Sequence, residues 1–133
     1  MKFPKYHDLA LLILRLTFGI FMIYGHGWGK IFRLFGDEPI RFADPFGLGP
    51  VASLALATFA EVVCAVLVAL GLLTRWALIP LIITMFVATF IAHGDDPFGK
   101  MEKPFMYFLT YIALFLAGPG KYSLDALIAG KKS

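Results

Sequence analysis

Charged side chains are scarce in this sequence: they make up 16% of its 133 residues, against roughly 25% in an ordinary soluble domain. Hydrophobic residues make up 59%, and the mean hydropathy is +0.79. A water-soluble fold of this length would need more polar surface to cover its core. The scarcity of charge therefore excludes an ordinary soluble domain and predicts an integral membrane protein.

Cysteine is nearly absent as well. Cys64 is the single cysteine, which excludes an intrachain disulfide and a Cys-x-x-Cys redox or zinc motif. The sequence also has no nucleotide fingerprint, no flavin motif and no His-Glu-x-x-His zinc pattern. Its 12 basic and 9 acidic residues are scattered between apolar stretches, which argues against nucleic acid as a partner.

Four apolar stretches of helical length occupy most of the chain. A membrane-spanning helix needs about 20 largely apolar residues, and the candidates are 9–26, 51–73, 76–92 and 104–117. The fourth is short, because Pro104 is expected to open it and the Gly-Pro-Gly sequence at 118–120 to end it. The sequence thus predicts an all-α fold, a four-helix bundle that forms a single multi-pass domain over 1–133 in the cell membrane.

Four crossings would place both termini on one side of the membrane, here named side A, and two loops on side B. Side A would carry six lysine and arginine residues and side B five, so the positive-inside rule favours cytoplasmic termini by a narrow margin. The aromatic and basic segment 27–50 is expected to lie in the membrane interface on side B.

The tail is expected to form a short helix over 123–129, capped by Ser123 and with Asp125 in its first turn. Arg75, in the turn between the second and third spans, is a candidate partner for Asp125. The alternative is that Arg75 extends to water, as interfacial arginines often do.

Ionisable residues within the spans are the most informative, because a charge in hydrocarbon costs roughly 2.5–3.5 kcal/mol even on insertion scales. Spacings of four, three, four and four residues place one set on a single face of the first helix: Arg15, Gly19, Met22, His26 and Lys30. We expect this face to point into the bundle, and Gly19 to allow a neighbouring helix to approach closely.

Glu61 is the one charged residue in the second span. Counted from side B at 1.5 Å per residue, Glu61 lies about 15 Å deep and Arg15 about 16 Å deep. The matching depths predict a buried Arg15–Glu61 ion pair. A pair that only fixes helix register, with no ligand, is an equally good interpretation.

Further polar residues gather near side B in this arrangement. With the predicted ion pair they give a candidate ligand-binding site that comprises Arg15, His26, Lys30, Glu61, His93 and Glu102. His26 and His93 end helices on the same side, so they are also candidate haem or metal ligands. No third ligand at a fixed spacing supports a metal, and histidines at helix ends often bind loop carbonyls instead.

An ordered set of residues along the chain resembles the DoxX family. It consists of Arg15-Leu-Thr-Phe-Gly19, Gly25-His26-Gly27 with Lys30, Glu61, Gly71-Leu-Leu-Thr-Arg75, Met85 with His93, Glu102, and Gly118-Pro-Gly-Lys-Tyr-Ser-Leu-Asp125. The resemblance covers nearly the whole chain and implies the four-helix membrane architecture of that family. Members include the small subunit of a thiosulfate:quinone oxidoreductase and proteins linked with membrane-associated oxidoreductase complexes, so the resemblance implies a redox-linked membrane component.

The leading functional hypothesis is therefore a bundle that holds a quinone between its helices. His26, His93 and Lys30 would donate hydrogen bonds to a carbonyl oxygen, and Glu61 with Arg15 would form a proton-linked pair. The chain would be a subunit without a redox centre of its own, in contact with membrane lipid and with a partner oxidoreductase subunit or further copies of itself. The alternatives are a non-enzymatic membrane anchor or assembly factor and, ranked last, a small transporter.

Overall fold

The computed structural model describes residues 4–40, 42, 44 and 46–130, and every regular element within them is helical. The chain folds into three long helical rods, a fourth long helix and a short terminal helix. The first rod consists of α1 (Pro4–Met22), η1 (Ile23–Gly27) and α2 (Trp28–Leu34), and the second of α3 (Pro50–Thr58), η2 (Phe59–Cys64) and α4 (Ala65–Leu70). The third rod consists of α5 (Thr74–Phe86) and η3 (Val87–Ala92), and α6 (Phe98–Ala117) and α7 (Leu124–Gly130) follow.

Three of these elements are long and apolar enough to cross a membrane: 6–34, 50–70 and 74–92. Their outward faces carry large apolar side chains such as Ile13, Phe21 and Leu56, which are 55%, 59% and 55% exposed. A soluble protein rarely leaves so much apolar surface uncovered. Hydrocarbon is the environment that suits these faces.

The first helix continues beyond the end that the sequence predicted for it. The predicted span ends at His26 and the predicted loop starts at Gly27, whereas the helix runs through a π-helical segment at Ile23–Gly27 and on to Leu34. Gly27 is buried against the second rod. Packing therefore keeps this glycine-rich stretch helical, and the loop between the first two rods is shorter than expected.

The fourth helix begins earlier than predicted, at Phe98, and Pro104 lies inside it. Proline at this position deprives the carbonyl of Lys100 of its helical donor. Lys100 lies in the exposed first turn of α6, where water can replace the missing bond. A proline in the second turn is thus compatible with the helix.

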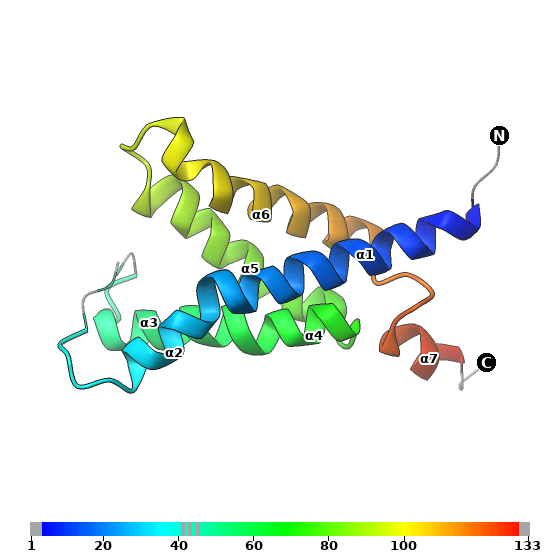
Figure 1. Ribbon diagram of the computed structural model, residues 1–133, viewed down its shortest axis with the longest axis horizontal. Coiled ribbons are helices and arrows are strands. Elements are labelled where there is room, and N and C mark those ends of the chain that lie inside the picture. The colour runs from blue at the N-terminus through cyan, green and yellow to red at the C-terminus, as the bar shows by residue number, and fades with distance from the viewer. Residues whose placement is uncertain (1–3, 41, 43, 45, 131–133) are drawn as a thin grey trace.

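The long helices pack in two main pairs, α1 against α4 and α5 against α6 (Figure 1). The first turn of α1 and helix α7 lie at one end of the molecule, and α2 and the loop after it lie at the other (Figure 1). The buried apolar core between the rods includes Met22, Ala60, Cys64, Ala65, Val68, Leu78, Leu81, Tyr111 and Leu114.

Two glycines bring the first and second rods into close contact. A Cβ atom on Gly19 would lie 2.9 Å from the carbonyl oxygen of Ala65 and 2.9 Å from the Cβ of Ala69. A Cβ atom on Gly27 would lie 2.7 Å from the carbonyl oxygen of Glu61. The close approach predicted at Gly19 is confirmed. Gly27 makes a second close contact, and it lies directly beside Glu61 of the second rod.

Candidate functional site

A buried ion pair joins the first and second rods. The Lys30 Nζ atom donates a hydrogen bond of 2.9 Å to Glu61 Oε1 and one of 3.4 Å to the carbonyl oxygen of His26. The Glu61 side chain is 2% exposed and that of Lys30 is 17% exposed. The second carboxylate oxygen, Glu61 Oε2, is buried and has no hydrogen-bond partner among the residues described here. The pair thus contains an acceptor atom that is not satisfied.

π-Helical segments lie at or near both sides of the pair. Glu61 lies within Phe59–Cys64, and Lys30 lies in α2, three residues after the end of the π-helical segment Ile23–Gly27, which contains His26. A π-helical segment widens the helix locally and often occurs at functional sites. The third rod has such a segment as well, Val87–Ala92, which contains Thr89. Thr89 is fully buried, and no partner for its hydroxyl lies in the described part of the chain.

Aromatic side chains of α6 close the bundle beside the first rod. The ring of Tyr107 meets the rings of His26 and Phe18 edge-on, each at a centroid distance of 5.3 Å. The Tyr111 hydroxyl donates a 2.9 Å hydrogen bond to the carbonyl oxygen of Phe18. The backbone carbonyl of His26 accepts the hydrogen bond from Lys30. His26 therefore links the ion pair to the aromatic face of α6.

Arg15 is buried as predicted, but its predicted pairing with Glu61 is wrong. Its guanidinium donates to the carbonyl oxygens of Val68 at 3.4 Å and Ala69 at 3.1 Å, and also to that of Tyr122. The predicted depths were counted from His26, although the first rod continues to Leu34. Glu61 consequently lies beside Gly27, while Arg15 lies beside the last turn of α4.

Arg15 and Asp125 each complement a helix end. Arg15 places a positive charge at the C-terminal carbonyls of α4, where the helix dipole favours it. Asp125 accepts hydrogen bonds from the backbone N–H groups of Leu73 (2.8 Å) and Thr74 (2.9 Å) and from the Thr74 hydroxyl (2.7 Å), at the start of α5. Burial raises the pKa of Asp125, but these bonds and the charge of Arg15 outweigh it, so the pKa lies below its usual value.

Of the two alternatives for Arg75, the contact with Asp125 is wrong. Arg75 donates to the carbonyl oxygens of Phe115 at 2.8 Å and Leu116 at 3.4 Å, near the end of α6. The predicted cap at Ser123 is confirmed, since its hydroxyl accepts a 3.1 Å hydrogen bond from the N–H of Ala126. Arg75, Arg15 and Asp125 therefore fasten the helix ends at the α7 end of the molecule.

The surroundings of His93 and Glu102 differ from those of the Lys30–Glu61 pair. His93 Nδ1 lies 2.8 Å from Asp96 Oδ2 in the turn before α6, and the two side chains are 39% and 38% exposed. Glu102 is exposed in the first turns of α6. Residues 4–40, 42, 44 and 46–130 contain no group of three or more His, Cys, Asp or Glu side chains that could hold a metal ion. The structure brings together Lys30, Glu61 and His26 out of the six predicted site residues.

Tyr107, Tyr111 and Thr89 are not among the site residues predicted from the sequence. The four-residue spacing of the tyrosines on one face of α6 was a usable signal, because a buried phenol needs a hydrogen-bond partner. Thr89 carries no local signal, since a threonine within an apolar run normally bonds to its own helix.

The amino-acid sequence of the chain is similar to those of several known proteins. Residues 10–94 match the DoxX family model. The chain is 31% identical to the inner membrane protein YqjF of Escherichia coli over 96% of this chain and 98% of that protein. It is 30% identical to an uncharacterized protein of Haemophilus influenzae over 90% of this chain and 83% of that one. The uncharacterized membrane protein Rv3486 of Mycobacterium tuberculosis is 32% identical over 73% and 74% of the two chains.

No solved structure matches the chain. The family match spans most of the first three rods, including Arg15, Gly19, His26, Lys30 and Glu61. With its apolar rods and its membrane-protein relatives, the chain belongs to the DoxX family of integral membrane proteins.

Proposed function

We propose that the Lys30–Glu61 pair binds the head group of a quinone, and that the chain is a quinone-interacting membrane component of an oxidoreductase complex. One observation carries this proposal: Glu61 Oε2 is buried beside a lysine ammonium, in an apolar bundle, without a partner among the described residues. An unsatisfied buried carboxylate oxygen costs free energy unless another group reaches it. A ligand that donates a hydrogen bond would remove that cost.

The donor and acceptor of the pair suit both redox forms of a quinone. The Lys30 ammonium has three donor hydrogens and uses two on Glu61 Oε1 and on the carbonyl of His26. A third can be donated to a quinone carbonyl oxygen. Glu61 Oε2 can accept a hydrogen bond from the hydroxyl of the reduced form. Reducing a quinone takes up protons, and intramembrane Glu and His side chains are suited to deliver them.

His26 is the residue that we expect to exchange protons with this site. Its ring packs edge-on against Tyr107, and its backbone carbonyl accepts a hydrogen bond from Lys30. The chain carries no redox motif, so the electrons would come from a partner subunit. In this proposal Arg15 holds the tail in place and does not contact the ligand.

The same proposal requires α6 to cross the membrane as a fourth helix. α6 has 20 residues, of which the first turns carry Lys100, Glu102 and Lys103. Its apolar part is therefore shorter than the roughly 20 residues of a usual crossing, and the charged turns would have to lie at the membrane interface. Its buried residues Tyr107, Tyr111 and Leu114 face the core. The lysines in its first turns would then lie at the side-B interface, and the termini would lie on the opposite, cytoplasmic side.

The test is to purify the full chain in native lipid discs and identify retained small molecules by mass spectrometry. Wild type should retain a quinone at close to one per chain. Lys30→Met and Glu61→Met should each reduce this amount by tenfold or more, since each removes a hydrogen bond to a charged group worth about 1.5–3 kcal/mol. Lys100→Met, at an exposed position of α6, is the matched control and should retain the wild-type amount. Finding only bulk phospholipid in every sample would overturn the proposal.

A membrane anchor or assembly factor is the second candidate, and a different surface favours it. Aromatic side chains at the α2 end are strongly exposed: Trp28 52%, Phe32 63%, Phe35 80% and Phe46 63%. Such a surface suits the docking of a partner protein. Retention of a crosslinked partner by Lys30→Met but not by Phe35→Ser would favour this role over quinone binding.

A further inference from the structure

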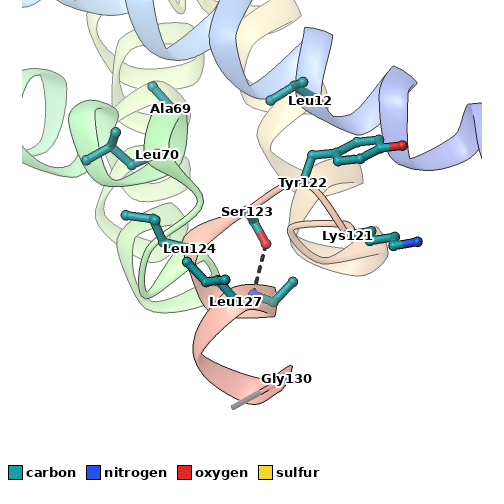
Figure 2. Close-up of a pocket in the computed structure, with 10 residues that line it drawn as sticks. Leu12, Ala69, Leu70, Lys121, Tyr122, Ser123, Leu124, Leu127 and Gly130 are labelled. Carbon is teal, nitrogen blue, oxygen red and sulfur yellow. Dashed lines mark hydrogen bonds between the residues drawn. The ribbon is translucent and has the colours of Figure 1, made fainter.

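A groove lies at the opposite end of the molecule from α2, between helix α7 and the first two rods. It is an open groove rather than an enclosed cavity, and its volume is about 680 Å³. Leu70 and Leu124 line one side, and Leu12 and Tyr122 lie across from them (Figure 2). Lys121 lies at the edge of the groove (Figure 2). The groove is thus apolar inside and basic at its margin.

From this arrangement we propose that the groove holds an acyl chain of an anionic phospholipid whose head group is bound by Lys121. The proposal concerns a site separate from Lys30 and Glu61, and it does not depend on quinone binding.

Helix α7 is held in place independently of any ligand, so the groove is preformed. Asp125 binds the start of α5, and its backbone N–H donates a 2.8 Å bond to the carbonyl oxygen of Gly71. Arg15 binds the carbonyl oxygen of Tyr122. These contacts fix α7 but leave its apolar side chains uncovered, since Leu124, Leu127 and Ile128 are 37%, 56% and 45% exposed. The uncovered side chains need an apolar partner.

The chemistry of the lining favours an acyl chain over a ligand that needs directional bonds. The Ser123 hydroxyl, the one side-chain hydroxyl of the lining other than that of Tyr122, is already used. It donates 2.7 Å to the carbonyl oxygen of Gly120 and accepts from the N–H of Ala126. The remaining lining residues offer mainly hydrocarbon surface.

The charges around the groove favour an anionic head group. Asp125 is engaged with the start of α5, and Asp8 Oδ1 accepts a 2.8 Å hydrogen bond from the backbone N–H of Lys121. The Lys121 side chain is exposed. Tyr122, 51% exposed, is of the residue type that prefers the head-group level. Lysines near a membrane surface are attracted to anionic lipid by about 1 kcal/mol each.

Native mass spectrometry of the purified full chain tests the proposal, with phosphatidylglycerol and phosphatidylcholine of identical acyl chains as probes. Wild type should bind one phosphatidylglycerol and prefer it over phosphatidylcholine by about fivefold. Ala126→Trp fills the groove and should reduce phosphatidylglycerol binding by tenfold or more. Lys121→Gln changes an exposed side chain only, and it should abolish the preference while leaving binding of the chain.

Two matched controls make the same types of substitution at positions away from the groove. Ala113→Trp places a tryptophan on an exposed position of α6, and Lys103→Gln removes an exposed lysine there. Both should bind lipid as wild type does. Equal binding of the two lipids by wild type, or undiminished binding by Ala126→Trp, would overturn the proposal. A lipid-free dimer that disappears in Ala126→Trp would also overturn it, because a second copy would then occupy the groove.

Discussion

Removing one partner of the Lys30–Glu61 pair should destabilise the protein more than removing both. At the observed N–O distance of 2.9 Å, the attraction is roughly 6 kcal/mol for an effective dielectric constant of about 20. Desolvation of two buried ions costs several kcal/mol each and offsets most of this attraction. The intact pair is therefore close to neutral, whereas a single remaining charge keeps its desolvation cost without any attraction.

The two single variants should differ because the two side chains differ in exposure. Lys30→Met should lower the free energy of unfolding by about 3–5 kcal/mol, since it leaves a carboxylate that is 2% exposed without a partner. Glu61→Met should cost about 1.5 kcal/mol, because the Lys30 side chain is 17% exposed and its ammonium can turn toward water. The double variant should lie within about 1 kcal/mol of wild type.

Reversible unfolding in mixed detergent micelles measures these differences, with tryptophan fluorescence as the signal. Trp28 reports on the first rod next to Lys30, and Trp76 reports on α5. Lys100→Met is the control and should change the free energy of unfolding by less than about 0.5 kcal/mol. Costs that simply add in the double variant would refute the reasoning, because they would mean that Lys30 and Glu61 do not act as a pair.

Three further predictions concern other contacts. Gly71 has φ +71, and a Cβ there would lie 2.4 Å from the Cβ of Ser123; Gly71→Ala should therefore destabilise by about 1–3 kcal/mol, whereas Gly25→Ala, with nothing within 4 Å, should be neutral or stabilising in the same unfolding assay. The pKa of Asp125 is lowered in the folded state, so its stabilisation is complete above a pH of about 4 and is lost as the pH falls through the lowered value. Unfolding measured against pH should show a weaker acid dependence in Asp125→Asn, and an identical dependence would contradict the role given to this carboxylate. Thr89→Val removes a buried hydroxyl without a partner among the described residues, so thermal unfolding should show equal or higher stability by up to about 1 kcal/mol. A clear loss would mean that the hydroxyl has a partner.

The sequence was sufficient to predict which face of the first helix is buried. Arg15, Gly19 and Met22 are buried and His26 and Lys30 are partly buried, because a charge facing lipid is costly and helical periodicity then fixes the rest of the face. The close approach at Gly19 was also predictable, since small residues are what allow membrane helices to meet.

The partners within that face were not predictable from the sequence. Gly25, His26 and Gly27 have the composition of a helix end, and counting depth from His26 made Arg15 the partner of Glu61. The helix continues because Gly27 packs directly on the carbonyl of Glu61, a tertiary contact that local composition does not reveal. Lys30 thereby becomes the partner of Glu61.

In the tail, too, a local contact was predictable from the sequence, whereas the tertiary contacts were not. The Ser123 cap involves an N–H three residues away and follows from a known local pattern. The partners of Arg75 and Asp125 lie 40 and about 50 residues away along the chain. The contact of Arg75 depends on how α5 packs against α6, and the contacts of Asp125 depend on how α7 docks against α5. The spacing of these residues along the sequence could not show which partner each of the two side chains would bind.

The most direct test of the proposed site is the equilibrium binding of a short-chain quinone to the protein in lipid discs. The Lys30→Met, Glu61→Met double variant is the informative comparison, because it should fold as stably as wild type while lacking both polar groups. We predict saturable binding of one quinone per wild-type chain and binding at least tenfold weaker in the double variant. Equal affinities in a double variant that is fully folded would contradict a quinone site at the Lys30–Glu61 pair.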